Sequence, residues 1–303
     1  MKISLRFKWT LLRSRLYIEH LRPRAFYLPA FIFLSVTLLS INSYRIYKDF
    51  DFWNSYETAG GNAFQFCETN RMDEIIRQPA NTWSNLGFLA VGLFALTLAV
   101  HDFKNKERKQ STNFLVRYPM FSLLYGLSCI YLFTGSFLYH ASLTSYFQRM
   151  DQSGMMAVIA MILVLNLYKI FPHFRRKGEW RSSHAIAMIL AVAFNLFIFR
   201  HLLTININLL FPALALLVIA SGFFYAFKIR NNSFFLNYMY AAFLILFFAV
   251  GIWILDRTHT LCSPDSMLQG HALWHLLTAT SIFFIYLYYR SGTIESRHRT
   301  LVL

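Results

Sequence analysis

The chain has 303 residues, of which 56% are hydrophobic and 14% are charged, and its mean hydropathy is +0.42. Soluble domains carry about 25% charged residues, so this composition excludes an ordinary soluble protein and predicts a polytopic membrane protein. The net charge of +15 would suit a nucleic-acid partner. The basic residues are spread between apolar runs, however, and this distribution argues against nucleic acid as a partner.

Eight apolar runs are each about 17–25 residues long, which is the length that crosses a bilayer as a helix. In chain order they cover about 25–44, 82–100, 118–139, 152–170, 184–200, 205–226, 235–255 and 271–290. The first run is longer than the core of a signal peptide and lacks a clear small-residue cleavage site, so we expect it to be retained. The sequence therefore predicts an all-α integral membrane protein.

Basic residues gather in every second segment between the runs. These segments are the residues before the first run, residues 101–117, residues 171–183, Lys228 with Arg230, and the tail that contains Arg297 and Arg299. The opposite segments contain acidic residues such as Asp49, Glu57 and Glu68. Because basic loops remain in the cytoplasm, the pattern predicts that both termini are cytoplasmic and that 45–81 is not. It suits a bacterial inner membrane with the opposite side facing the periplasm.

The cysteines fit this topology. Cys67 and Cys262 both fall in predicted non-cytoplasmic segments, whereas Cys129 lies within an apolar run. An oxidising compartment permits a disulfide between the first two. Sequence alone does not show whether their Cα atoms lie close enough, so two free thiols remain the alternative.

Four side chains that can bind metals or carry protons lie at the edges of three apolar runs. His140 is at the end of the third run, Asp151 comes just before the fourth, and His271 and His275 begin the eighth. The predicted topology places all of these edges on the non-cytoplasmic side, at one membrane depth. Ionisable residues within a membrane are costly and are usually functional. We therefore expect the four side chains to converge.

The spacing of the histidines favours zinc. His271 and His275 are four residues apart and share one helix face. With His140 they provide three imidazoles, and three protein ligands plus water form an open catalytic zinc site. Haem is disfavoured, because a pair on one helix face cannot approach opposite faces of the ring. Ser136, one turn before His140, is placed to bind water or a substrate oxyanion.

Several strings together resemble the alkaline ceramidase family, one of the seven-helix membrane hydrolases that also include adiponectin-type receptors. The strings are FCETN at 66–70, PANTWSNL at 79–86, GSFLYH at 135–140, Asp151, LDRTHTLCSP at 255–264 and HALWH at 271–275. The resemblance covers about 64–290. It implies a seven-transmembrane-helix bundle at 82–290, preceded by a basic N-terminus and an additional helix at 1–44 and a non-cytoplasmic segment at 45–81, and followed by a cytoplasmic tail at 291–303.

The resemblance also implies roles for residues. His140, His271 and His275 would bind zinc, and Ser136 and Asp151 would hold and polarise the attacking water. The substrate would be a lipid amide such as ceramide, which is cut to a long-chain base and a fatty acid. Whether the substrate is ceramide or another N-acyl lipid stays open, as does the oligomeric state.

The family has a calcium site before its first core helix, and only part of it is present here. Glu68 and Asn70 fit that site, but Gln65 and Gln78 stand where the family has acidic residues. The loss of two carboxylates weakens the attraction for Ca²⁺, although Asp73 or Glu74 could substitute. The alternative is a hydrogen-bonded lid over the bundle. The polar residues Asn81, Thr82, Ser84 and Asn85 are expected to cap helices or join them.

Two other functions remain as alternatives to a hydrolase. A lipid-sensing receptor of the same superfamily would need a cytoplasmic signalling segment, and the predicted tails are short. A proton or ion transporter could use the His and Asp cluster as a relay, but relays usually place ionisable groups through the depth of the membrane. The sequence therefore favours a zinc-dependent lipid amidase.

Overall fold

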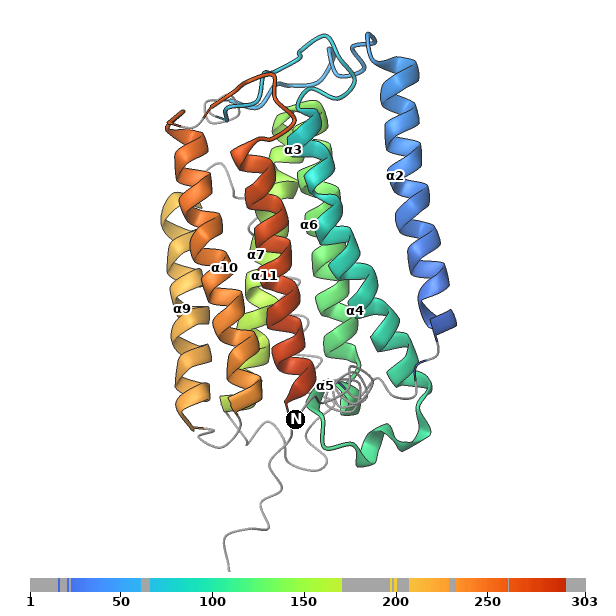
Figure 1. The fold of residues 1–303 in the computed structure, drawn as a ribbon, viewed down its shortest axis with the longest axis vertical. Coiled ribbons are helices and arrows are strands. Elements are labelled where there is room, and N and C mark those ends of the chain that lie inside the picture. The colour runs from blue at the N-terminus through green and yellow to red at the C-terminus, as the bar shows by residue number, and fades with distance from the viewer. Residues whose placement is uncertain are drawn as a thin grey trace, which may run out of the picture.

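The computed structural model describes residues 16, 21, 23–60, 66–170, 197, 199–200, 207–228, 233–260 and 262–292. Within these residues the chain forms helices and no strand (Figure 1). The helices are η1 (Pro23–Phe26), α2 (Tyr27–Tyr47), α3 (Pro79–Ser84), α4 (Leu86–Lys104), η3 (Lys106–Gln110), α5 (Phe114–Arg117), α6 (Met120–Ser142), α7 (Ser145–Ile170), α9 (Ile207–Lys228), α10 (Ser233–Arg257) and α11 (Gly270–Ser291).

Six of the described helical segments are long and apolar enough to cross a membrane. They are Pro23–Tyr47, Pro79–Lys104, Met120–Ser142, Ser145–Tyr168, Leu236–Arg257 and Gly270–Ser291. The predicted run at 205–226 coincides with α9, whose described apolar part, Leu209–Phe224, is shorter. The run at 184–200 falls almost wholly outside the described residues. The all-α class is thus confirmed, with six candidate membrane spans among the described residues, while the count of seven helices plus one stays a prediction.

The apolar runs gave the helix positions but not their first turns. The fourth run was expected to begin at about residue 152, yet α7 begins at Ser145, so Asp151 lies in the second turn of the helix. The second run was expected at 82, yet the helical segment begins at Pro79. Polar first turns lower the local hydropathy, so a search for apolar runs starts too late. Asp151 therefore lies about 9 Å along the helix axis from Ser145, the first residue of α7.

Helix α6 is the centre of the packing and contacts both α4 and α7. Glycines let the backbones meet there. A Cβ added to Gly135 would lie 2.6 Å from the carbonyl carbon of Met150, and one added to Gly154 would lie 2.7 Å from the Cα of Leu132. Such small residues are typical of close helix pairs in membranes. The close approach at Gly135 holds the α6 turn with Ser136 against the α7 turn with Asp151.

The remaining helices surround this centre. Helix α11 packs against α10, α3 and α4, and α7 packs against α9. Helix α2 stands at the side of the bundle and contacts α4 (Figure 1). None of the α2 residues is buried, as expected for a helix that faces lipid over most of its surface.

The two ends of the bundle differ in character. At the end formed by the α4 and α11 C-termini, the fully buried Arg290 pairs with the fully buried Asp102, with Nη2 3.0 Å from Oδ1. At the other end, loops formed by residues 48–60, 66–78, 258–260 and 262–269 cover the helix ends (Figure 1). A buried ion pair of this kind specifies which helix ends lie together more than it adds to the stability of the fold. The covered end carries the candidate site.

Candidate metal centre

Three histidines from two helices meet beneath the loops at the covered end. His140 lies in the last turn of α6, and His271 and His275 lie in the first two turns of α11. Each is buried, with at most 5% of its surface exposed. One ligand nitrogen from each ring lies within 4.8 Å of the other two. The predicted convergence of the three imidazoles is therefore what the structure shows.

The second nitrogen of two rings is held by the protein. The Nδ1 of His140 lies 2.6 Å from the Oε1 of Gln78. The Nδ1 of His275 lies 3.1 Å from the carbonyl oxygen of Asn81 and 2.8 Å from the Oγ of Ser84. Since a carbonyl oxygen only accepts hydrogen bonds, Nδ1 carries the proton in both rings. The Nε2 atoms are then unprotonated and free to bind a metal.

The third ring is held by stacking. The ring of Phe66 lies over the ring of His271, with centroids 3.7 Å apart and an interplanar angle of 27°. The Nδ1 of His271 is buried and has no hydrogen-bond partner among the described residues. The backbone N–H of His271 donates to the Oδ1 of Asp256 at 3.0 Å, which fixes the start of α11.

The geometry fits a zinc ion. The Nε2 atoms of His140 and His271 are 3.3 Å apart. Two nitrogens that are each 2.0–2.1 Å from a tetrahedral zinc lie about 3.3–3.4 Å apart. Buried imidazoles whose second nitrogen is held by the protein, as in His140 and His275, are typical zinc ligands.

Ser136 and Asp151 meet one turn below His140. The side chain of Ser136 interacts with the carboxyl group of Asp151. Ser136 is 1% exposed, and it precedes His140 by four residues, so both lie on one face of α6. The two helices that carry the pair are in backbone contact at Gly135. The sequence predicted this pair at the site, and its catalytic role stays a prediction.

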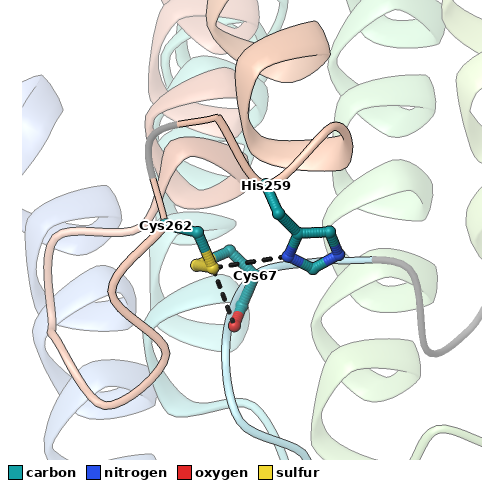
Figure 2. Close-up of side chains that lie close together, drawn as sticks. All are labelled: Cys67, His259 and Cys262. Carbon is teal, nitrogen blue, oxygen red and sulfur yellow. Dashed lines mark hydrogen bonds between the residues drawn. A yellow bond between two sulfur atoms is a disulfide. The ribbon is translucent and has the colours of Figure 1, made fainter.

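A lid formed by residues 66–78 crosses the site and is tied down by a disulfide. Cys67 and Cys262 are bonded, with Cα atoms 5.4 Å apart (Figure 2), which resolves the choice between a disulfide and free thiols. His259 lies beside the bond, with its Nδ1 3.4 Å from the Sγ of Cys262. Thiolates bind metals, and a disulfide has none. The group formed by Cys67, His259 and Cys262 is therefore a covalent cross-link and not a second metal centre.

Asp256 is a residue that the sequence analysis missed. It is 1% exposed, and it accepts from two backbone N–H groups, that of His271 at 3.0 Å and that of Cys67 at 3.2 Å. One carboxylate thus joins the end of α10, the start of α11 and the lid. The available signal was its position, since Asp256 is an acidic residue that ends an apolar run on the same predicted side as the histidines.

Comparison with protein families agrees with this site. A sequence model described as Ceramidase matches residues 60–301, which includes the lid, all three histidines, Ser136 and Asp151. The chain belongs to the ceramidase family. Among curated proteins no match is found. Membership in the ceramidase family implies a membrane hydrolase that acts on lipid amides.

The calcium site of the ceramidase family does not fit the lid seen here. The two carboxylate oxygens of Glu68 accept from the backbone N–H groups of Ala80 and Asn81 at 2.7 and 2.9 Å. The Oδ1 of Asn70 accepts from the Nε2 of Gln78 at 2.6 Å. The oxygens proposed as calcium ligands are therefore engaged by protein donors, while Gln65 lies outside the described residues.

Charge around Glu68 is balanced within the chain. Burial raises the pKa of the Glu68 carboxyl group, and the N–H groups of Asn81 and Ala80 and the charge of Arg71 oppose that rise. The two acidic residues named as substitutes do not complete a site either. Glu74 lies 3.6 Å from Lys48 and 3.9 Å from Arg71, and Asp73 is exposed.

We expect Gln78→Leu to weaken metal binding at the histidine trio by about 10–100-fold, because partners of ligating histidines typically contribute that much to metal affinity. Gln78→Glu should retain tight binding, since a carboxylate also accepts from the Nδ1 of His140. The measurement is a competition titration of purified protein with a zinc chelator. Gln110→Leu, an exposed position on η3, is the control. Equal zinc affinity in Gln78→Leu and wild type would show that Gln78 does not orient the ligand.

Proposed function

We propose that this ceramidase is a zinc-dependent membrane amidase that hydrolyses ceramide or a related N-acyl lipid to a long-chain base and a fatty acid. The observation that carries the proposal is the buried trio His140, His271 and His275, whose ligand atoms lie within 4.8 Å of one another. The family match supports the amide bond as the target. The six apolar helices support a lipid as the substrate.

In this proposal the three histidines would hold the ion, and Gln78, Asn81 and Ser84 keep the rings of His140 and His275 in place. When bound, zinc supplies Lewis acidity, which polarises a carbonyl group and lowers the pKa of water from 15.7 to about 7. The proton chemistry is left to the side chains near the ion.

Asp151 acts as the general base and then as the general acid. Its carboxylate takes a proton from the attacking water, whose oxygen forms a bond to the amide carbon. The proton then passes to the amide nitrogen as the carbon–nitrogen bond breaks, which yields a carboxylic acid and an amine. The hydroxyl of Ser136 orients Asp151 in the resting state. In the transition state the same hydroxyl would donate to the oxyanion that develops on the carbonyl oxygen.

Buried acceptors near the site support a substrate with hydroxyl groups. The Oδ1 atoms of Asn81 and Asn85 are buried and have no hydrogen-bond partner among the described residues. The two residues are four apart, at the α3–α4 junction, so they share a face. Buried acceptors without partners are costly. A lipid with hydroxyl donors, such as the sphingoid part of ceramide, would satisfy them.

The orientation in the membrane is also a proposal. Alternation of basic segments supports cytoplasmic termini, and the Cys67–Cys262 disulfide supports a lid in an oxidising compartment. Both support a metal centre at the non-cytoplasmic side, as in a bacterial inner membrane with a periplasmic site. The family match begins at residue 60, which supports α2 as an addition to the hydrolase core.

We expect purified protein to contain one equivalent of zinc and to release fatty acid from a fluorescent ceramide. Treatment with 1,10-phenanthroline should abolish hydrolysis, and added zinc should restore it, because no other group of this site polarises the carbonyl as strongly. Parallel assays with an N-acyl amino acid test the class of lipid amide. A folded protein without zinc, or hydrolysis that resists metal removal, would overturn the proposal.

A further inference from the structure

Arg71 lies among carboxylates on the surface of the lid. Its Nη1 is 3.6 Å from the Oε1 of Glu68, its Nε is 3.9 Å from the Oε1 of Glu74, and its Nη2 is 4.0 Å from the Oδ1 of Asp265. The first two partners belong to the lid, and the third belongs to the 258–269 loop. One guanidinium group therefore faces carboxylates from both segments that cover the metal centre.

The guanidinium group of Arg71 is partly buried between lid residues. The Arg71 side chain is 24% exposed, whereas the side chains of Glu68 and Glu74 are 1% and 16% exposed. The backbone of Arg71 is fixed as well, because its N–H donates to the carbonyl oxygen of Arg77 at 2.9 Å. Coulomb attraction is stronger in a partly desolvated place than in bulk water. The guanidinium thus offsets the charge that Glu68 buries there.

Gln78 makes a second connection that a carboxylate cannot make. Its Nε2 donates to the Oδ1 of Asn70 at 2.6 Å, and its Oε1 accepts from the Nδ1 of His140 at 2.6 Å. A carboxylate at this position has no N–H to donate to the Oδ1 of Asn70, and it would add a negative charge to the lid. The neutral amide joins Asn70 to His140 without adding that charge.

We propose that Arg71 and Gln78 replace the calcium ion of the ceramidase family, so that this lid folds and covers the metal centre independently of calcium. Arg71 provides the positive charge that faces Glu68 and Glu74. Gln78 provides the bridge from Asn70 to His140. The Arg71 cation is covalently part of the protein and is always present. A bound calcium ion would stabilise the protein only to the extent that free calcium is present relative to its Kd. The inference concerns the lid and does not depend on the reaction.

The test measures stability and not activity. Full-length protein is passed over a chelating resin, its zinc content is checked, and calcium is titrated to about 5 mM, above the 10⁻⁴–10⁻³ M range of weak extracellular sites. The apparent Tm should move by less than about 1 °C, whereas calcium at about 5–50 times the Kd of such a site would raise it by about 2–9 °C. A calcium-dependent rise of that size in wild type would overturn the proposal.

Variants of Arg71 test its role as the cation. Arg71→Gln should lower the apparent Tm by about 3–6 °C, because buried Glu68 loses its counter-charge. Arg71→Lys keeps the charge and should recover most of this loss. Arg45→Gln, which removes an exposed arginine from α2, is the matched control. If Arg71→Gln were as stable as Arg45→Gln, or if Arg71→Lys were as unstable as Arg71→Gln, the positive charge would not be what holds the lid.

Discussion

His275→Ala is expected to abolish amide hydrolysis and to release the bound zinc. This ring provides one of three ligand nitrogens gathered within 4.8 Å, and an open site with only two protein ligands does not retain zinc well. Changes to partners of ligands alone cost 10–100-fold. Loss of a ligand should therefore lower kcat/KM by at least about 10³-fold, with zinc content falling in parallel in elemental analysis.

The appropriate control for His275→Ala removes a histidine at the opposite end of the bundle. His101 lies in the last turn of α4, far along the helix from the metal centre, so His101→Ala should keep both zinc and activity. Size-exclusion profiles and apparent Tm show whether each variant is folded. A folded His275→Ala protein that keeps stoichiometric zinc and wild-type turnover would contradict the assignment of the metal centre.

The convergence of the histidines could be predicted because a membrane limits where polar groups can lie. Apolar runs give the helix positions, and charge bias gives the side on which each run ends. His140, His271 and His275 were thereby placed at one depth before any contact was known. In a soluble protein the same residues would have had no shared depth, and the spacing of His271 and His275 alone would have been a weak signal.

The supporting contacts could not be predicted, because they join segments far apart in the chain. Asp256 binds the N–H of Cys67, which is 189 residues away, and Gln78 binds His140, which is 62 residues away. Gln78 was read as a lost calcium ligand because only its type was visible. Its amide has two functions, as donor to Asn70 and acceptor from His140, and only the structure shows that both are used.

Asp151→Asn should separate metal binding from proton transfer. The side chain interacts with Ser136 on α6 and is not a member of the histidine trio, so zinc should remain stoichiometric in the variant. An amide cannot accept the proton of the attacking water, and general base catalysis contributes about 10²–10⁴-fold. We therefore expect kcat to fall by that factor at unchanged zinc content, with a smaller fall, about 10–10²-fold, for Ser136→Ala.

Asp73→Asn is a matched control for the change at Asp151, because it removes a carboxylate that is exposed on the lid. It should leave kcat and zinc content at wild-type values. Loss of zinc together with activity in Asp151→Asn would instead make Asp151 a structural support of the metal centre. Wild-type kcat in Asp151→Asn would remove it from the reaction, since no proton could then be passing through its carboxylate. The pair of readouts thus decides between a residue that binds the ion and one that works beside it.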